Sequence, residues 1–126
     1  MNMEVEVIKG RFSVCKVDSV DGIDLHSDYS FIGKTDSEIS LVCPEKDVPV
    51  RTIERDDGWN MFRFTGQLDF SLIGILSKVS TLMADNGIGI FAVSTFDTDY
   101  ILIKEKDFQR ALTILKDTGY TITPSD

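Results

Sequence analysis

Two aspartates in one short polar run are the residues whose chemistry needs explaining first. Asp97 and Asp99 flank Thr98 directly after an apolar segment. Carboxylates beside a turn can accept charge-assisted hydrogen bonds from an ammonium or guanidinium group. Aspartate is also a common turn residue, so the same run is equally typical of a hairpin turn with no ligand. Both interpretations fit the residue types.

A helix start earlier in the chain offers the opposite kind of partner. Apolar residues spaced by three and four predict a helix over about residues 72–86, with Asp69 or Ser71 as its N-cap. Free N–H groups of a first helical turn, at residues 72–74, attract a carboxylate. Gly74 has no side chain to block that approach, although it would equally permit close packing of helix on sheet. A free amino acid needs both kinds of partner, the helix start and the two aspartates.

Other chemistries find little support in the sequence. The single histidine, His26, and the two cysteines, Cys15 and Cys43, are too few for a His/Cys zinc site. The cysteines are expected to be small apolar side chains on strands in a reducing compartment. The two aspartates could form an acid–base pair or a magnesium site in a small hydrolase or transferase, but no Lys, His or Gly-rich phosphate loop lies near them. The expectation is a protein without cofactor or metal that is not an enzyme.

Charge and composition narrow the class of partner. The chain has 126 residues and a net charge of −8, with 42% hydrophobic residues, which predicts one ordinary domain or two small modules. An acidic chain repels phosphate backbones and anionic membrane surfaces, so we expect no nucleic-acid and no membrane partner. The beginning of the sequence lacks the pattern of a signal peptide, and its apolar stretches are shorter than the ~20 residues of a spanning helix. A cytoplasmic location is expected.

The second half of the chain has the clearer element pattern. It predicts strand, helix, strand, strand, helix, strand, the ferredoxin-like split βαβ order in which two helices cover one face of an antiparallel sheet. Alternation in the first strand puts Phe62 and Phe64 on one face and Arg63 on the other. The strand over residues 88–94 is apolar on both faces and is expected to be central. The predicted segments are residues 59–65, 72–86, 88–94, 100–103, 106–117 and 120–123.

The first half shows short alternating patterns instead. Residues 29–32 and 38–43 predict a hairpin joined by a polar turn, and Pro44 is placed to begin one helical turn. Residues 55–58, Arg-Asp-Asp-Gly, have a turn composition and are predicted to be the main break in the chain. This break divides the sequence into an N-terminal module over residues 1–57 and a C-terminal domain over residues 58–126.

The run that contains the two aspartates resembles a known family. Residues 87–103, Gly-Ile-Gly-Ile-Phe-Ala-Val-Ser-Thr-Phe-Asp-Thr-Asp-Tyr-Ile-Leu-Ile, resemble ACT domains, with the CASTOR arginine sensors and their small bacterial relatives as the nearest branch. The resemblance is specific over residues 59–119, where residues 94–100 are a near signature, and weaker over residues 12–49. It implies an α+β fold: a βαββαβ ACT module preceded by a degenerate ACT-like module, with antiparallel sheets and helices on one face.

The resemblance also implies where a ligand binds. The family's effector loop corresponds to residues 66–74, and its Asp-x-Pro-Gly pattern falls on residues 71–74, where only Gly74 is kept. Asp69, two residues upstream, is available as a substitute for the missing aspartate. The CASTOR-like branch implies further contacts from the run that ends at Asp99. The expected ligand-binding residues are Asp69, Ser71, Leu72, Ile73, Gly74, Ser94, Thr95, Phe96, Asp97, Thr98 and Asp99.

These features together predict a cytoplasmic regulatory protein that forms a homodimer and binds a free amino acid. The family places such effectors at interfaces between modules or subunits. If Asp97 and Asp99 both face the site, a cationic amino acid is the first candidate. The alternative is an ACT-fold assembly module that has lost its ligand, which the altered pattern at residues 71–74 favours.

Overall fold

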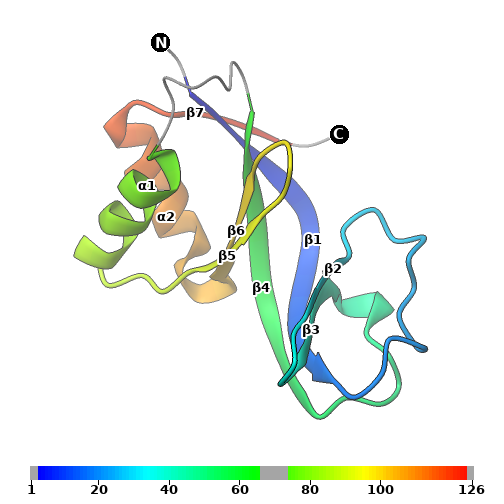
Figure 1. Ribbon diagram of the computed structural model, residues 1–126. Coiled ribbons are helices and arrows are strands. Elements are labelled where there is room, and N and C mark those ends of the chain that lie inside the picture. Colours follow the sequence, from blue (N-terminus) through cyan, green and yellow to red (C-terminus); the bar gives the residue numbers. More distant parts are fainter. Residues whose placement is uncertain (1–2, 66–73, 125–126) are drawn as a thin grey trace. The chain divides into compact units, whose positions relative to one another are not determined.

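The computed structural model describes residues 3–65 and 74–124 of the chain (Figure 1). The chain divides into two compact units. The large unit comprises residues 1–9 and 60–126, and the small unit comprises residues 10–59. Within the described ranges, no helix is long and apolar enough to cross a membrane.

The described elements are strands and helical segments, and both unit boundaries fall inside long strands. Strands β1 and β4 therefore contribute residues to both units. In chain order the elements are β1 (Glu4–Val17), β2 (Phe31–Lys34), β3 (Ile39–Pro44), the 3-10 turn η1 (Glu45–Asp47), β4 (Glu54–Thr65), α1 (Ile75–Asp85), β5 (Phe91–Ser94), β6 (Asp99–Lys104), α2 (Glu105–Thr118) and β7 (Thr121–Pro124).

The large unit has the predicted α+β character. Its described strands lie in the order β7-β1-β4-β6-β5, and α1 and α2 cover one face of this sheet (Figure 1). The order β4-α1-β5-β6-α2-β7 matches the predicted succession of elements. One pairing was not predicted: β1 lies between β4 and β7, and its first residues pair with β7 in parallel. The sheet is thus mixed rather than wholly antiparallel.

Strand β5 corrects a second expectation, because it ends the described strand order instead of occupying its centre. Phe91 and Val93 are half-buried, whereas Ala92 and Ser94 are exposed. This one-sided burial suits an edge strand. The prediction of a central strand rested partly on the apolar residues 88–90. These residues precede β5, and Ile88 packs into the core of the large unit.

The core of the large unit forms where the helices meet the sheet. Phe62 and Phe64 are buried with their ring centroids 5.8 Å apart, and Phe62 also lies 6.3 Å from Phe108 of α2. The apolar residues whose spacing predicts the two helices are buried or half-buried where the structure describes them. The buried members of this core are Val5, Phe62, Phe64, Val79, Met83, Ile88, Ile101, Ile103, Phe108, Ala111 and Leu115.

A glycine lies at or next to each end of helix α1. Helix α1 begins at Ile75 with Gly74 as its N-cap in a left-handed conformation (φ 92°), so the predicted caps Asp69 and Ser71 are wrong. The side-chain-free Gly74 adopts this φ at little cost, and it offers no capping hydrogen bond. Gly87, just after the C-terminal end of the helix, has a left-handed φ of 70°, as is common for the glycine that follows a helix.

The small unit contains the predicted hairpin. Strands β2 and β3 pair antiparallel, β3 pairs antiparallel with β1, and the predicted helical turn after Pro44 is η1. Cys15 and Cys43 are free and buried in the core of this unit beside Val17 and Leu41, as predicted for small apolar side chains. Burial raises the pKa of the Cys43 thiol from 9.0 to about 12.

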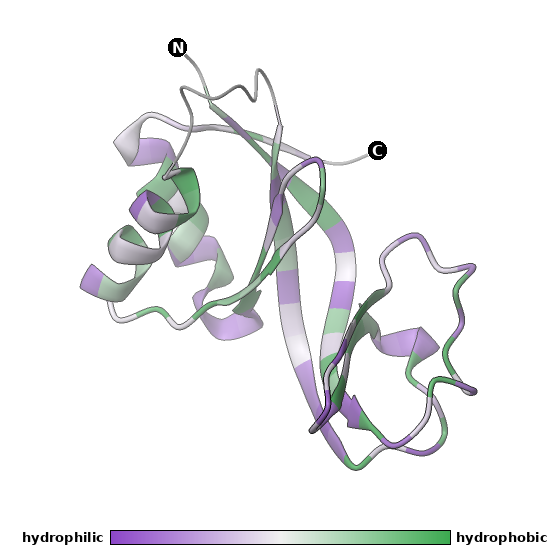
Figure 2. Cartoon of the chain, viewed as in Figure 1, coloured by the Kyte–Doolittle hydropathy of each residue, from purple (hydrophilic) through white to green (hydrophobic). Residues whose placement is uncertain are grey.

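The predicted turn at residues 55–58 is wrong, because β4 continues through it. The polar side chains that indicated a turn have tertiary partners: the Ser13 hydroxyl lies 2.5 Å from Asp57 Oδ1, and the Gly58 N–H donates to Glu45 Oε2 at 2.8 Å. Gly58 has φ +83°, which an L side chain rarely adopts. The hydrophilic colouring of this end of β4 is visible in Figure 2. Tertiary hydrogen bonds therefore overrode the local turn signal.

The hairpins of the two units are related by a sequence repeat. The predicted order of strands and helices did not reveal this repeat. With an offset of 91 − 31 = 60, Phe31 matches Phe91, Thr35 matches Thr95, and the Glu-Lys-Asp at 45–47 matches that at 105–107. Strands β3 and β6 share one burial pattern, and their registers with β2 and β5 are equivalent. The equivalence is therefore structural as well as sequential.

Candidate functional site

The predicted ligand-binding run forms the turn between β5 and β6, and its two threonines close that turn. The Thr95 N–H donates to the Thr98 carbonyl at 2.8 Å, and the Thr95 hydroxyl donates to the same oxygen at 2.9 Å. The Thr98 hydroxyl donates to the Phe64 carbonyl at 2.8 Å, which fixes the turn to the end of β4. Thr95 and Thr98 therefore have a structural role that needs no ligand.

Ser94 and Asp99 are a second pair of predicted site residues that the structure brings together. They are opposite one another in the β5–β6 register, and the Ser94 hydroxyl donates to Asp99 Oδ1 at 2.5 Å. Asp99 is half-buried. One carboxylate offers about four acceptor positions, and Ser94 occupies one of them. Among the described residues, Asp99 thus presents an oriented anion with acceptor capacity left for a cation.

The other two residues of the turn behave differently. Asp97 is exposed. The Phe96 side chain is fully exposed at the tip, with a relative exposure of 104%. That Asp97 and Asp99 together form one cation site stays a prediction.

Of the predicted helix-start residues, the structure describes Gly74, the cap of α1. Asp69, Ser71, Leu72 and Ile73 lie outside the described residues. Because α1 begins at Ile75, the first N–H groups of the helix belong to the turn that starts there rather than to residues 72–74.

Arg63, Glu6 and Tyr100 form a charged cluster beside this turn that the sequence patterns did not predict. Arg63 donates to Glu6 at 2.7 Å and to the Tyr100 hydroxyl at 3.2 Å, and its guanidinium lies 5.9 Å from the centre of the Tyr100 ring. The hydrogen bond to Tyr100, with that to Glu6, raises the pKa of Arg63 above its ordinary value. This guanidinium already has two partners, so it serves to join β1, β4 and β6. The one sequence signal for this cluster was the alternation in β4, which places Arg63 on the face opposite Phe62 and Phe64.

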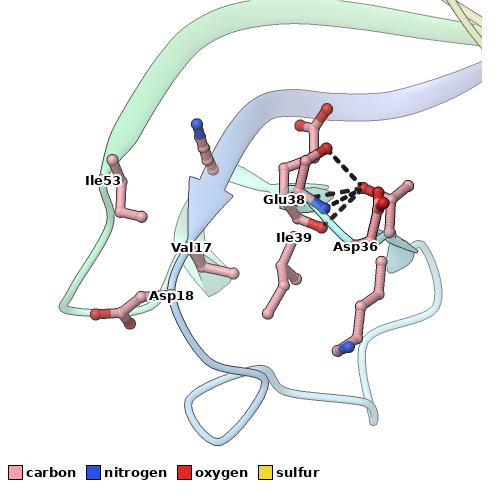
Figure 3. Close-up of a pocket in the computed structure, with 10 residues that line it drawn as sticks. Val17, Asp18, Asp36, Glu38, Ile39 and Ile53 are labelled. Carbon is pink, nitrogen blue, oxygen red and sulfur yellow. Dashed lines mark hydrogen bonds between the residues drawn. The ribbon is translucent and has the colours of Figure 1, made fainter.

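A cavity of about 310 Å³ in the small unit was also missed (Figure 3). It lies at the β2–β3 turn, which the 60-residue offset equates with the β5–β6 turn. The Thr35 N–H donates to the Glu38 carbonyl at 2.9 Å, as Thr95 does to Thr98. Recognising the repeat in the sequence would have pointed to this turn. The lining residues are Lys16, Val17, Asp18, Lys34, Thr35, Asp36, Ser37, Glu38, Ile39 and Ile53.

In the described part of the chain, no three His, Cys, Asp or Glu side chains are grouped so that they could hold a metal ion.

The chain matches the family model of the ACT domain over residues 54–117. It is similar to the crystal structure of protein Atu0741 from Agobacterium tumefaciens, with 29% identity and a TM-score of 0.86, covering 100% of this chain and 96% of that one. A search of curated proteins found no significant match.

More distant structures share the fold. Protein VC0802 of Vibrio cholerae, described as a possible transport protein of unknown function, has 18% identity and a TM-score of 0.73, covering 94% of this chain and 91% of that one. The aspartate kinase of Clostridium acetobutylicum, described as an allosteric enzyme, has 11% identity and a TM-score of 0.67. The match covers 93% of this chain and 34% of the kinase.

Proposed function

Because the chain belongs to the ACT domain family, we propose that it is a regulatory protein that binds a free amino acid and catalyses no reaction. The observation that carries this proposal is the family match, which covers β4, α1, β5, β6 and most of α2. The free, buried thiols of Cys15 and Cys43 suit a reducing compartment such as the cytoplasm.

The ligand proposed for the β5–β6 turn is a cationic amino acid. Its ammonium or guanidinium group binds the Asp99 carboxylate, which Ser94 holds in place at 2.5 Å. The N–H groups of the first turn of α1, next to its cap Gly74, would hold the α-carboxylate. The predicted loop residues Asp69, Ser71, Leu72 and Ile73 would complete the site, with Asp69 as a further partner for a cationic group. Asp97 adds negative charge near the site without a contact of its own, which raises the local concentration of cations.

Two ACT-like modules in tandem, over residues 1–57 and 58–126, are part of the proposal. The 60-residue repeat supports it, since the β2–β3 and β5–β6 hairpins share their register and the Thr turn, and β3 and β6 share one burial pattern. Where α2 follows β6, only the short η1 follows β3, so the N-terminal copy is degenerate. Assignment to the CASTOR-like branch is a finer prediction that rests on residues 94–100.

Regulation follows if the ligand favours one arrangement of subunits over another. We propose a homodimer in which the amino acid binds at an interface between subunits. A ligand shifts such an equilibrium only by its difference in affinity for the two states. Catalysis is unnecessary for this role.

A second candidate function is an ACT-fold assembly module without a ligand. The fully exposed Phe96 at the tip of the β5–β6 turn favours it, because a large exposed aromatic side chain is typical of a surface that binds another protein.

A thermal-shift screen with the twenty amino acids separates the two functions. A ligand that binds only the folded state raises the melting temperature, so we expect at least one cationic amino acid at 5 mM to raise it. Asp99→Asn should abolish that shift, whereas Asp117→Asn, the same change on the exposed end of α2, should keep it. Loss of the shift in both variants would show that net charge, not the site, is responsible.

A further inference from the structure

The chain passes between the two units at two places, and both lie inside strands. In β1 the boundary falls between Lys9 and Gly10, and in β4 it falls between Trp59 and Asn60. Any change in the arrangement of the units must therefore be taken up by backbone angles near these two crossings.

Each crossing carries a glycine with a left-handed backbone. Gly10 has φ 106° and is next to the boundary in β1, and Gly58 has φ 83° and lies two residues before the boundary in β4. The other described glycines with positive φ lie at helix ends, where such a φ is common: Gly74, Gly87 and Gly119. Inside a strand, a glycine of this kind typically marks a bulge or a bend.

Packing does not explain the glycine at position 10. A Cβ on Gly10 would meet nothing within 4 Å, so there is room for a side chain. What glycine supplies here is backbone freedom, because it populates positive and negative φ about equally. The strand can therefore change its course at Gly10 without a steric penalty.

The burial pattern of β1 also changes at the crossing. Ile8 and Phe12 are buried, but the three residues between them, Lys9, Gly10 and Arg11, are all exposed. A strand packed on one face buries every second residue. Three consecutive exposed residues show that this part of β1 inserts no side chain into a core, and segments with few buried contacts open most easily.

Side-chain contacts join β1 to β4 on either side of the crossing. In the large unit, Arg63 of β4 donates to Glu6 of β1 at 2.7 Å. In the small unit, the Ser13 hydroxyl of β1 donates to Asp57 of β4 at 2.5 Å. Each unit thus holds its own part of the strand pair, and a rotation at the crossing breaks neither contact.

We propose that residues 9–11 of β1 and 58–60 of β4 form a hinge about which the two units turn relative to one another. Gly10 and Gly58 absorb the change in φ, and the contacts on either side keep the two strands paired. The hinge needs no ligand, so it does not rest on the proposed amino-acid site. A molecule that binds one arrangement of the units more tightly would shift the population toward that arrangement.

The distance between two spin labels on the full chain, measured by pulsed electron paramagnetic resonance, tests the hinge. One label is attached at Lys34→Cys on β2 and the other at Lys116→Cys on α2, both exposed positions in different units. The reference pair is Lys78→Cys with Lys116→Cys, both in the large unit. Cys15 and Cys43 are buried, and label uptake by the unsubstituted chain checks that they do not react. We expect the distance distribution across the units to be about twice as wide as that of the reference pair.

Gly10→Ala tests the hinge residue itself. An alanine disfavours a left-handed φ, so the strand should take another course at position 10 and shift the mean distance across the units. Gly87→Ala is the matched control, because Gly87 also has a left-handed φ and an open Cβ position but lies outside the hinge. It should leave the distance across the units unchanged.

The outcomes separate the hinge from the proposed function. A wide distribution that Gly10→Ala shifts and Gly87→Ala retains supports the hinge. A distribution across the units as narrow as that of the reference pair overturns it, even if Gly10→Ala fails to fold. An unchanged distribution in folded Gly10→Ala, or an equal shift in Gly87→Ala, also overturns it. Failure of every amino acid in the thermal-shift screen contradicts only the proposed ligand binding.

Discussion

The Asp99 carboxylate is the single group on which the proposed amino-acid site depends most. Its orientation comes from one hydrogen bond, donated by Ser94 at 2.5 Å. A carboxylate that is already oriented loses less conformational freedom when a cation binds. In the proposed site, Ser94 therefore acts as a positioning residue for Asp99.

Ser94→Ala should weaken binding of the cationic amino acid while leaving the fold intact. Removal of the hydrogen bond should lower the unfolding free energy by about 1 kcal/mol and the affinity several-fold, as measured by urea unfolding and calorimetry. Ser80→Ala is the control, because the Ser80 hydroxyl bonds only within α1. Unchanged affinity in Ser94→Ala would show that Asp99 needs no positioning.

Cys43 gives stability a specific dependence on alkaline pH. The native thiol stays protonated up to a pKa of about 12, whereas the unfolded thiol ionises above 9.0. Between these values the native state binds more protons, so the unfolding free energy falls as pH rises, by at most about 1.4 kcal/mol per pH unit. Urea unfolding at pH 8, 9 and 10 should show a shallower fall in Cys43→Ala. Parallel curves would contradict burial as the cause.

At the scale of elements, the course of β4 through its polar end depends on Gly58. Its φ of +83° is a backbone conformation that L side chains rarely adopt, although a Cβ at this position would have room, because the Arg11 guanidinium 3.5 Å away is at an ordinary contact distance. The glycine lets the strand continue while its N–H reaches Glu45.

Gly58→Ala should therefore lower the unfolding free energy by about 1–2 kcal/mol, which urea unfolding can measure. Gly89→Ala serves as the matched control, because Gly89 has no left-handed φ and nothing lies within 4 Å of its Cβ position. Equal losses in the two variants would mean that β4 tolerates an L residue at position 58.

Local patterns predicted the elements whose packing follows from periodicity. The spacing of Phe108, Ala111 and Leu115 predicts α2, and alternation places Phe62 and Phe64 on the helix-covered face. The predictions were wrong where residues far apart in the sequence determine the local structure. The polar residues 55–58 form strand because Ser13 and Glu45 satisfy them, and β1 pairs with β7 across nearly the whole sequence. A single-sequence pattern carries no signal of those partners.

The candidate site was predicted unevenly for a related reason. Ser94 and Asp99 stand in one hairpin, so sequence proximity suffices to bring them together. The β2–β3 cavity depends on Val17, Ile39 and Ile53 from three segments, and Lys34 joins them only through strand register. The repeat at residues 31–47 and 91–107 was the available signal for that turn.

At the scale of the whole molecule, a homodimer is expected from the proposed regulatory role. Sedimentation velocity of the full chain should show mainly dimer at micromolar concentration. Phe96→Ser, which removes the exposed aromatic side chain, tests the assembly role in the same measurement. Weaker association in Phe96→Ser than in Val50→Ser, an equally exposed apolar residue, would place the contact at the β5–β6 turn. A monomer at all concentrations would contradict the dimer.

The net charge of −8 also concerns the whole molecule. An acidic surface attracts cationic solutes generally, so added salt should weaken nonspecific attraction more than binding at a built site. Titrations of the proposed ligand at low and at physiological ionic strength should therefore be compared, because binding at a built site should weaken less with salt than nonspecific attraction.

Isothermal titration calorimetry of the full chain against each of the twenty amino acids tests the central claim most directly. The proposed function predicts saturable binding by at least one of them, tightest for arginine or lysine, and its loss in Asp99→Asn. Absence of binding by all twenty at millimolar concentration would contradict an amino-acid-binding role and leave the assembly module as the function.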